Sequence, residues 1–231
     1  IANNGNLART KITWFYPNSM SPRRLAQLRM AWNDSYTELF NRDGSTRNLS
    51  ESVAPIQFYF RRYATATNLV NVDIGGGTTD IAFSSNGKVE YITSFKFAAN
   101  SLFEDSFSDI NPNNGIVDWF KNDILGLLQS KPELNELVNI FNSNLGQPAN
   151  MASFLFSLKD NSATKSLARN NIDFHKILQN DTKFKLVFII FYTAIIYHIA
   201  QIIKTKSLKA PRHIAFSGNG SKIISIISSD P

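Results

Sequence analysis

Runs of apolar residues predict a strand and then a helix near the start of the chain. Residues 11–16 are rich in β-branched and aromatic side chains and end at Pro17, which predicts a strand. Ser21 and Pro22 are typical of a helix start, and the apolar residues that follow recur every three or four positions. This spacing predicts a helix over 22–40. Its apolar face comprises Leu25, Leu28, Trp32, Tyr36 and Leu39.

The following segments predict a loop, a helix and a β-meander. Residues 41–50 are polar and predict a loop, and residues 51–63 predict a helix that tolerates Pro55 in or near its first turn. Three β-rich stretches come next, at 68–74, 78–84 and 88–97. Asn86-Gly87 is a strong signal for a two-residue hairpin, whereas 75–77 is a run of three glycines. We therefore predict three consecutive strands with a glycine turn at one end.

The second half of the chain has mainly helical patterns. Residues from about 101 to 181 are rich in asparagine, with turn signals at 111–115 and 146–148, and predict a helical insertion. Residues 186–203 carry no charge and are long enough for a membrane span. Polar residues interrupt this run, and a strand, a glycine-rich turn and a helix start follow it over 213–227. We therefore favour a core helix of a soluble α/β protein over a membrane span.

Composition narrows the possible chemistry. With 43% hydrophobic and 18% charged residues, the chain can bury a core. The absence of cysteine excludes a disulfide scaffold, a thiolate zinc site and a cysteine nucleophile, and the three histidines lack metal-ligand spacing. The net charge of +6 favours an anionic ligand or partner. Basic residues gather before residue 66, where a solvated surface is favoured over a nucleic-acid or membrane face, because no nucleic-acid-binding module is apparent.

The strongest candidate for chemistry is the segment 72–80 (VDIGGGTTD). Its glycines let the backbone turn and approach a ligand, and their N–H groups, with a following threonine hydroxyl, can converge on an anion. Asp73, just before the turn, is placed to hold a hydrated Mg²⁺. The loop joins two predicted strands, unlike a Rossmann or Walker loop, and neither of those motifs is present. The alternative is a glycine-rich hairpin turn with solvated ends.

Residues 73–80 (DIGGGTTD), with apolar β residues before them, closely resemble the second phosphate-binding motif of the actin-like ATPases. That superfamily includes actin, the seventy-kilodalton heat-shock chaperones, sugar kinases and bacterial division and segregation actins. The resemblance implies an α/β fold of the actin-like, ribonuclease H-like kind. It also implies that Asp73 acts through Mg²⁺ and water. The implied ligands of the β- and γ-phosphates of ATP are Gly75, Gly76, Gly77, Thr78 and Thr79.

Two further segments resemble the same family. Residues 51–55 (ESVAP) are similar to the Glu-Pro-x-Ala segment on the helix that links the two domains, which implies that Glu51 lies near the attacking water. The alternative is an acid at a helix start, facing the helix dipole. Residues 215–222 (AFSGNGSK) resemble the adenosine motif, with Asn219 in place of the usual second glycine. Asparagine tolerates left-handed dihedrals better than most residues, so the turn can still form. The implied adenosine contacts are Gly218, Asn219, Gly220, Ser221 and Lys222; the alternative is a small-residue turn before a helix.

The chain also departs from the family pattern. Residues 97–100 (FAAN) stand where the family often has a glycine pair, and the first phosphate motif and the final connecting helix are absent. The chain begins at Ile1, without an initiator methionine or a signal-peptide pattern. We therefore expect a fragment. Residues 1–66 would be the remnant of a first actin-like domain with the interdomain helix, and 67–231 a second domain with the insertion at about 101–181.

The resemblance implies a cytoplasmic protein that binds and hydrolyses ATP. Its nucleotide state, ATP or ADP, would control domain closure and contacts with protein partners or with further copies of itself. Glu51 and Asp73 would be the catalytic residues, acting by positioning and by charge stabilisation. One alternative is a non-catalytic actin-like scaffold or filament protein. A less favoured alternative is a phosphotransferase of the sugar-kinase type.

Overall fold

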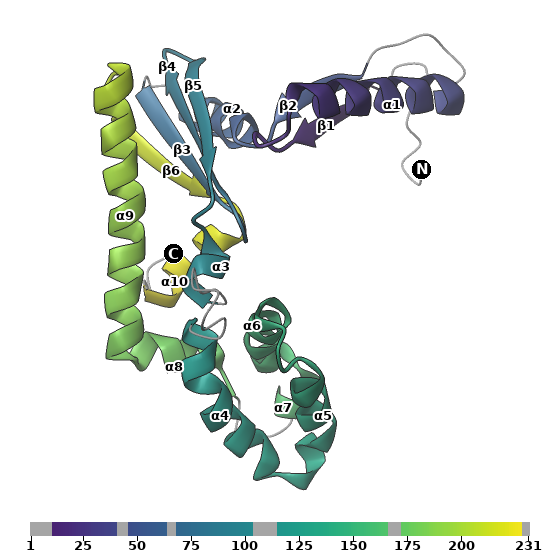
Figure 1. Ribbon diagram of the computed structural model, residues 1–231, viewed down its shortest axis with the longest axis vertical. Helices are drawn as coiled ribbons and strands as arrows, with labels where there is room; N and C mark the ends of the chain where they lie inside the picture. Colours follow the sequence, from purple (N-terminus) through teal and green to yellow (C-terminus); the bar gives the residue numbers. More distant parts are fainter. Residues whose placement is uncertain (1–10, 41–45, 64–67, 104–114, 166–171, 228–231) are drawn as a thin grey trace. The chain divides into compact units, whose positions relative to one another are not determined.

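The computed structural model describes residues 11–40, 46–63, 68–103, 115–165 and 172–227 (Figure 1). The chain divides into two compact units, which are described one at a time. The first unit comprises 1–73, 80–95 and 209–217, and the second comprises 74–79, 96–208 and 218–231. The predicted domain boundary between residues 66 and 67 stays a prediction.

The first unit begins with a strand, a helix and a second strand. β1 (Thr13–Tyr16) pairs in parallel with β2 (Arg47–Ser50), and α1 (Pro22–Phe40) lies between them in the chain. The predicted strand and helix are confirmed, but the prediction of a loop throughout 41–50 is wrong. Its last four residues form β2 because the backbone pairs with β1, so tertiary pairing overrides a low β-propensity.

α1 buries only part of its predicted apolar face. Tyr36 is buried, and Trp32 stacks on Trp14 of β1 with ring centroids 6.1 Å apart. Leu39, at the end of the predicted face, is 75% exposed. The helix is therefore held to β1 by aromatic side chains along a narrow strip.

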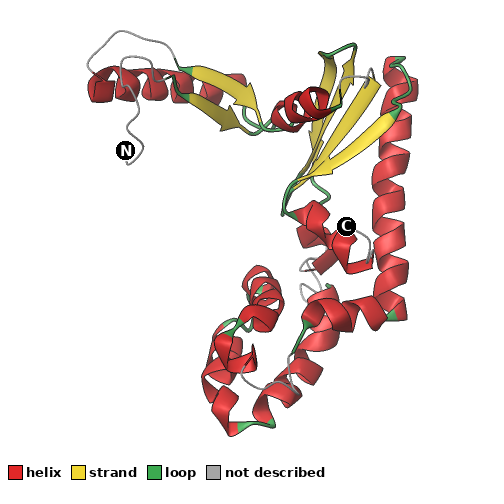
Figure 2. Cartoon of the chain, turned by 180° about the vertical axis from the view of Figure 1, so that it is seen from behind, coloured by secondary structure: helices red, strands yellow, loops and turns green. Residues whose placement is uncertain are grey.

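A four-stranded sheet forms the rest of the first unit. Its strands are β3 (Asn68–Ile74), β4 (Thr79–Ser85), β5 (Lys88–Phe95) and β6 (His213–Ser217), in the order β5-β4-β3-β6 (Figure 2). Asn86 and Gly87 have φ angles of 50° and 76°, as a two-residue hairpin requires. β6 pairs in parallel with β3 and places Asp73 opposite Ser217. The predicted meander is confirmed, and β6 extends it on the β3 side.

The helix α2 (Val53–Arg62) supplies the core of this unit. Ile56 of α2, Leu69 of β3 and Ala82 of β4 are buried and form one cluster, which shows that α2 packs on the sheet. Partly buried residues complete the cluster: Tyr59, Phe60, Val89, Ile92 and Ala215. Burial of this apolar surface is what holds β3 in place. The polar residues at the end of β3 are therefore carried by a well-packed strand.

The second unit is mainly helical. Its helices before residue 181 are α3 (Ala99–Phe103), α4 (Ile116–Gln129), α5 (Asn135–Ser143), α6 (Pro148–Ser157), α7 (Ser162–Lys165) and α8 (Phe174–Asn180). Short 3-10 turns lie at η2 (Pro132–Leu134) and η3 (Leu158–Asp160). Its core combines leucine and isoleucine with several phenylalanines, and Phe156 packs edge-on against both Phe103 and Phe174. The predicted helical structure is confirmed for the described residues between 101 and 181, and its status as an insertion stays a prediction.

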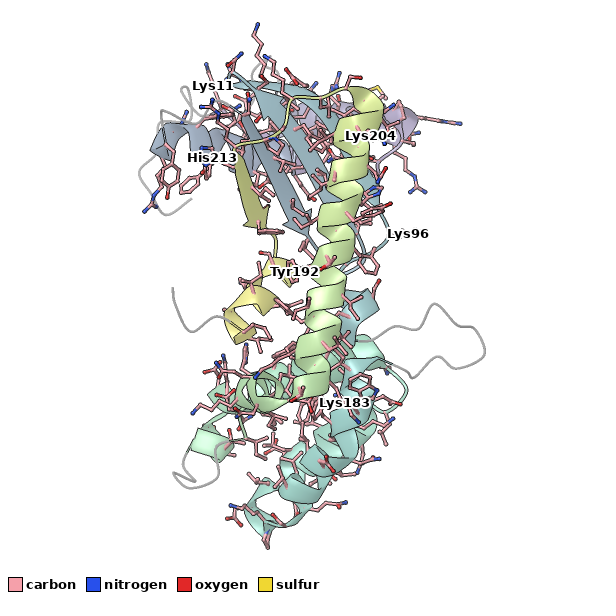
Figure 3. The ribbon with its side chains drawn as sticks, turned by 90° about the vertical axis from the view of Figure 1, so that its left-hand side faces the viewer. Lys11, Lys96, Lys183, Tyr192, Lys204 and His213 are labelled. Carbon is pink, nitrogen blue, oxygen red and sulfur yellow. The ribbon has the colours of Figure 1, made fainter. Side chains whose placement is uncertain are left out.

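The helix α9 (Thr182–Lys206) is the long apolar helix predicted over 186–203. It is buried along one stripe, formed by Phe184, Phe191, Ile195 and Ile199. Figure 3 shows Lys183 and Lys204 near its two ends. Among the described residues it is the one helix long and apolar enough to cross a membrane, and 17% of its 18-residue apolar window is buried. The expectation of a core helix thus holds for one stripe and is wrong for the remaining faces.

Candidate functional site

Three carboxylates interact in the first unit. Asp73 lies near the end of β3 and is half-buried, Asp80 is the second residue of β4 and is buried, and Glu51 lies in the turn before α2. Partial loss of solvent is the main cause that raises the pKa of both Glu51 and Asp73; Asp73 is half-buried, whereas Glu51 is exposed overall and only partly shielded from water. The negative charge of Asp80 raises both pKa values further, and that of Asp73 also raises the pKa of Glu51. The two predicted catalytic acids therefore share one region of negative potential.

Ser217 partly offsets the cost of ionising Asp73. Its Oγ donates a hydrogen bond to Asp73 Oδ2 at 3.0 Å, and this bond lowers the pKa of Asp73. The contact follows from the parallel register of β3 and β6, which places the two residues opposite each other. It joins two of the motifs found in the sequence, although the residues are 144 positions apart.

Glu51 lies between two buried serines. Its backbone N–H donates to Tyr16 O at 3.0 Å, which continues the β1–β2 pairing. Ser50 donates to the side-chain oxygen of Asn18, whose amide donates to Ser52, so both serines are bonded through one asparagine. Glu51 itself is exposed and lies two residues before α2, so the prediction that it lies on the helix is wrong. The turn holds its backbone while the carboxylate reaches solvent.

The glycine turn belongs to the second unit and is closed by backbone hydrogen bonds. Gly75 N–H donates to Thr78 O at 2.9 Å. The first two residues of α3 also form hydrogen bonds with the turn: Ala99 N–H donates to Gly75 O, and Asn100 N–H donates to Gly76 O. Residues 97–100, which lack the glycine pair of the family pattern, thus begin a helix that stabilises the turn.

The three glycines of the turn differ in how much space surrounds them. None of them has the left-handed backbone that favours glycine. A Cβ on Gly75 would lie 3.1 Å from Thr78 O and one on Gly76 would lie 2.8 Å from Asn100 Oδ1, whereas a Cβ on Gly77 would meet nothing within 4 Å. Gly76 and Gly77 are exposed, and their N–H groups donate to none of the described residues. These two amides are therefore the ones an anion can reach.

Thr79 does not fit its predicted role. Its side chain is fully buried, and its Oγ1 donates to the backbone oxygen of Phe97 at 2.6 Å. A threonine hydroxyl has one proton, so Thr79 has none left for a phosphate. Thr78, which precedes it, is half-buried and remains a candidate.

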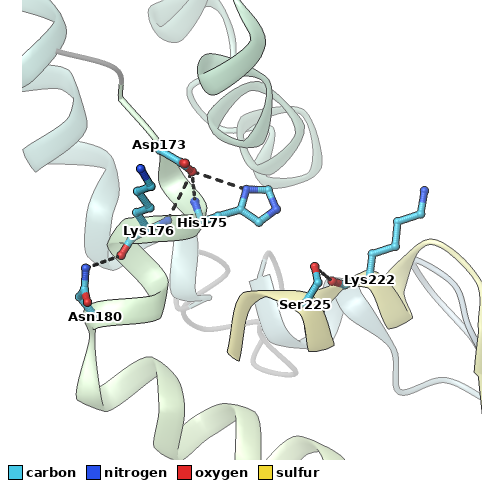
Figure 4. Close-up of polar contacts among 6 residues, drawn as sticks. All are labelled: Asp173, His175, Lys176, Asn180, Lys222 and Ser225. Carbon is cyan, nitrogen blue, oxygen red and sulfur yellow. Dashed lines mark hydrogen bonds and ion pairs between the residues drawn. The ribbon is translucent and has the colours of Figure 1, made fainter. Parts of the chain in front are cut away.

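The predicted adenosine segment forms a turn and the short 3-10 helix η4 (Gly220–Ile223). Gly218 has a φ of 83°, whereas Asn219 is right-handed with a φ of −67°, so Asn219 does not use the left-handed backbone that asparagine tolerates. Glycine at 218 supplies that backbone instead. Ser221 Oγ donates to Gly218 O at 2.7 Å and helps to close the turn. The exposed Lys222 side chain extends from η4 in Figure 4.

Gly220 packs directly on the glycine turn. It is buried, and a Cβ there would lie 2.6 Å from Gly75 O and 2.7 Å from Ile74 O. No side chain fits at such distances, so this glycine is required by packing. Together with the bond between Ser217 and Asp73, the contact brings together two motifs that are distant in the sequence.

The carboxylates suit a hydrated cation better than a directly bound one. Within the described ranges, no group of three or more His, Cys, Asp or Glu residues is arranged to hold a metal ion. Mg²⁺ often keeps several waters and binds through one or two carboxylates together with phosphates. Asp73 fits such a role because burial, and to a smaller extent the charge of Asp80, raise its pKa, and a cation would offset both costs of ionisation.

Sequence reasoning identified Glu51, Asp73 and the glycine turn but missed the polar residues that support them. Ser217 was visible only as part of the adenosine motif. Ser50, Ser52 and Asn71 gave no motif signal, because a serine beside an acid or an asparagine within a strand is common in any sequence. Their roles come from side-chain hydrogen bonds between distant segments.

Comparisons with known proteins give partial structural similarity only. No protein-family model matches the chain, and no curated protein matches it. The structure of MreB5 of Spiroplasma citri bound to AMPPNP is 20% identical over 52% of this chain and 29% of that chain, with a TM-score of 0.28. The ADP-bound form covers the same shares at 20% identity and a TM-score of 0.27.

A phosphatase gives a match of similar extent. The Aquifex aeolicus Ppx/GppA phosphatase is 14% identical over 44% of this chain and 35% of that chain, with a TM-score of 0.26. This chain therefore spans about a third or less of each of these proteins. Overlaps of this size carry no argument about mechanism, which must come from the residues themselves.

Proposed function

We propose that this chain is part of an actin-like protein that binds ATP and hydrolyses it. The observation that carries the proposal is the hydrogen bond from Ser217 to Asp73, which joins the acid of the phosphate motif to the strand that leads into the adenosine motif. The close packing of Gly220 on the glycine turn supports the same pairing of motifs. A glycine-rich hairpin turn alone would require neither contact.

In this proposal the phosphates of ATP bind the exposed amides of the glycine turn. Gly76 and Gly77 offer N–H groups that donate to no described residue, and Gly77 leaves open space where a side chain would stand. Thr78 adds a half-buried residue next to them. Backbone amides of this kind form a concave site for anions. Thr79 supports the turn through Phe97 and makes no phosphate contact.

Asp73 would hold Mg²⁺ through water, and Glu51 would orient the attacking water. A bound Mg²⁺ would neutralise charge on the phosphates. Asp73, whose ionised form is stabilised by the Ser217 hydroxyl, would accept hydrogen bonds from the water molecules of that ion. The raised pKa of Glu51 brings its carboxylate closer to the basicity that a water-polarising group needs at neutral pH.

The adenosine would lie against the turn at 218–222. Gly218, Asn219 and Ser221 present backbone there, and the exposed Lys222 has the reach to contact the base. Gly220 contributes by holding the turn against the glycine hairpin. Coupling of the nucleotide state to protein partners or self-association belongs to the same proposal. The cytoplasmic location remains a prediction from the sequence.

A non-catalytic scaffold is the second candidate. It is favoured by the Thr79 hydroxyl, which is occupied by Phe97, and by Asn100, whose side chain lies against Gly76 where a family member often has glycine. Such a protein would bind nucleotide without turning it over. Hydrolysis measurements therefore distinguish the two candidates.

Glu51→Gln is the variant that tests the catalytic proposal. We expect steady-state ATP hydrolysis to fall at least tenfold, roughly the lower part of the range for a lost acid–base group, with little change in nucleotide affinity. Glu90→Gln, an exposed residue on β5, is the matched control and should leave both quantities unchanged. Binding of a fluorescent ATP analogue reports affinity. Unchanged hydrolysis in Glu51→Gln would overturn the role of Glu51, and binding without hydrolysis in the wild type would favour the scaffold.

A further inference from the structure

Asn71 is a polar residue at the centre of β3, in its buried part. Its side chain is fully buried, it stands between Val70 and Val72 in β3, and its Oδ1 has no hydrogen-bond partner among the described residues. A buried amide with an unpaired oxygen lowers stability, and an apolar side chain would avoid that cost. Stability of the sheet therefore gives no reason for an asparagine here.

The amide nitrogen of Asn71 contacts two groups that lead to the carboxylates. Nδ2 donates to Ser217 Oγ at 3.1 Å, and Ser217 Oγ donates to Asp73 Oδ2 at 3.0 Å. Nδ2 also donates, at a long 3.4 Å, to the backbone oxygen of Ser52, the neighbour of Glu51 in the chain. A backbone carbonyl only accepts hydrogen bonds, so the nitrogen of the amide must be the atom that faces Ser52.

These contacts fix the direction of the Ser217 hydroxyl. A serine hydroxyl has one proton to donate and two lone pairs that accept. Because Asn71 donates to the oxygen, one lone pair is occupied and the single proton remains for the carboxylate of Asp73. Asn71 and Asp73 are two positions apart in β3 and so lie on the same face of the sheet, which allows Ser217 to reach both.

We infer that Asn71 is a positioning residue, which holds the Ser217 hydroxyl on Asp73 and the backbone of the Glu51 turn in one hydrogen-bonded network. The inference rests on the proposed function, in which Asp73 and Glu51 act on the same nucleotide. Without the amide, the Ser217 hydroxyl can rotate away and the Ser52 carbonyl loses its donor. The two carboxylates then lack a common anchor, although the residues proposed to bind phosphate and adenosine are unchanged.

Asn71→Leu in the full chain tests this role, because leucine has the same branched shape, although it is larger, and its side chain forms no hydrogen bonds. We expect kcat for ATP hydrolysis to fall about 10- to 100-fold, as for other residues that orient metal-associated groups, with KM for ATP changed less than about twofold. Asn68→Leu is the matched control. Asn68 lies at the start of β3 and accepts a hydrogen bond from Ser85 Oγ at 3.1 Å, so its loss should leave kcat unchanged.

Variants of Ser217 test the same network from its other side. Ser217→Ala should lower kcat as much as Asn71→Leu, and Ser217→Thr, which keeps the hydroxyl, should restore most of it. The double variant Asn71→Leu/Ser217→Ala should be no slower than either single variant, because both remove one linked contact. Ser217 is only half-buried, so its variants keep the test valid if Asn71→Leu does not fold.

Urea denaturation of the wild type, Asn71→Leu, Ser217→Ala and the double variant, all without nucleotide, separates this inference from the proposed function. A non-additive loss of kcat without a parallel loss of stability would support the network, and a loss of kcat that follows the loss of stability would overturn it. The inference would be overturned if the wild type hydrolyses ATP but the effects of the two substitutions on kcat are additive, or if kcat is unchanged in Asn71→Leu and Ser217→Ala. The proposed function would still stand in either case. A wild-type protein that hydrolyses no ATP would overturn both, whatever denaturation shows.

Discussion

Replacement of Gly220 by alanine tests the packing that brings the glycine turn and the adenosine turn together. The new Cβ would lie 2.6 Å from Gly75 O, 2.7 Å from Ile74 O and 2.8 Å from Ile74 Cγ2. Ordinary contact starts at 3.4 Å, so the two backbone oxygens would have to move by 0.7 to 0.8 Å. Overpacking of this kind costs about 1 to 3 kcal/mol, and the closeness of backbone atoms favours the upper half of that range.

Urea denaturation measures this loss directly. With a slope of about 2 kcal/mol per molar urea, the midpoint of Gly220→Ala should fall by roughly 0.5 to 1.5 M. Gly77→Ala is the matched control for stability, because its Cβ would meet nothing within 4 Å. We expect that variant to change the free energy of unfolding by less than about 0.5 kcal/mol. Equal midpoints for Gly220→Ala and the wild type would refute the close packing of the two turns.

Three further predictions concern stability. Gly126→Ala, in the middle of α4 with open space around its Cβ, should raise the free energy of unfolding by about 1 kcal/mol, measured in urea. Thr79→Val should lower it by about 1 to 3 kcal/mol, because the backbone oxygen of Phe97 loses the partly buried hydrogen bond from the Thr79 hydroxyl, while affinity for a fluorescent ATP analogue stays unchanged. The raised pKa values of Glu51 and Asp73 mean that the folded state holds protons more tightly than the unfolded state. Their contribution to stability is therefore present below their ordinary pKa values of 4.5 and 3.8 and is lost as pH rises through the raised values. A Glu51→Gln/Asp73→Asn variant should lose less stability over the same rise in pH, and thermal melting at several pH values would show this.

The sequence predicts best those elements that local physics determines. β3 was predicted with its final boundaries because an apolar run ends at a glycine, and the hairpin at Asn86 was predicted because few residues adopt its backbone. β2 was missed, since its four residues become a strand only through pairing with β1. The left-handed position of the adenosine turn was also not located, because the tolerance of Asn219 for that backbone does not show that Gly218 adopts it. Errors thus arose where a distant segment or an adjacent residue decides the conformation.

The candidate site shows the same division more sharply. The sequence motifs pointed to Asp73 and the glycines. They did not distinguish Gly77, where a Cβ would meet open space, from Gly220, where close packing leaves no room for one. They also gave Thr79 a ligand role that its bond to Phe97 excludes. A motif combines positions that contact a ligand with positions that hold the turn, and only the surroundings of each side chain separate the two. The separation makes a specific claim: a side chain at Gly77 should weaken phosphate binding at little cost in stability, whereas one at Gly220 should act first through stability.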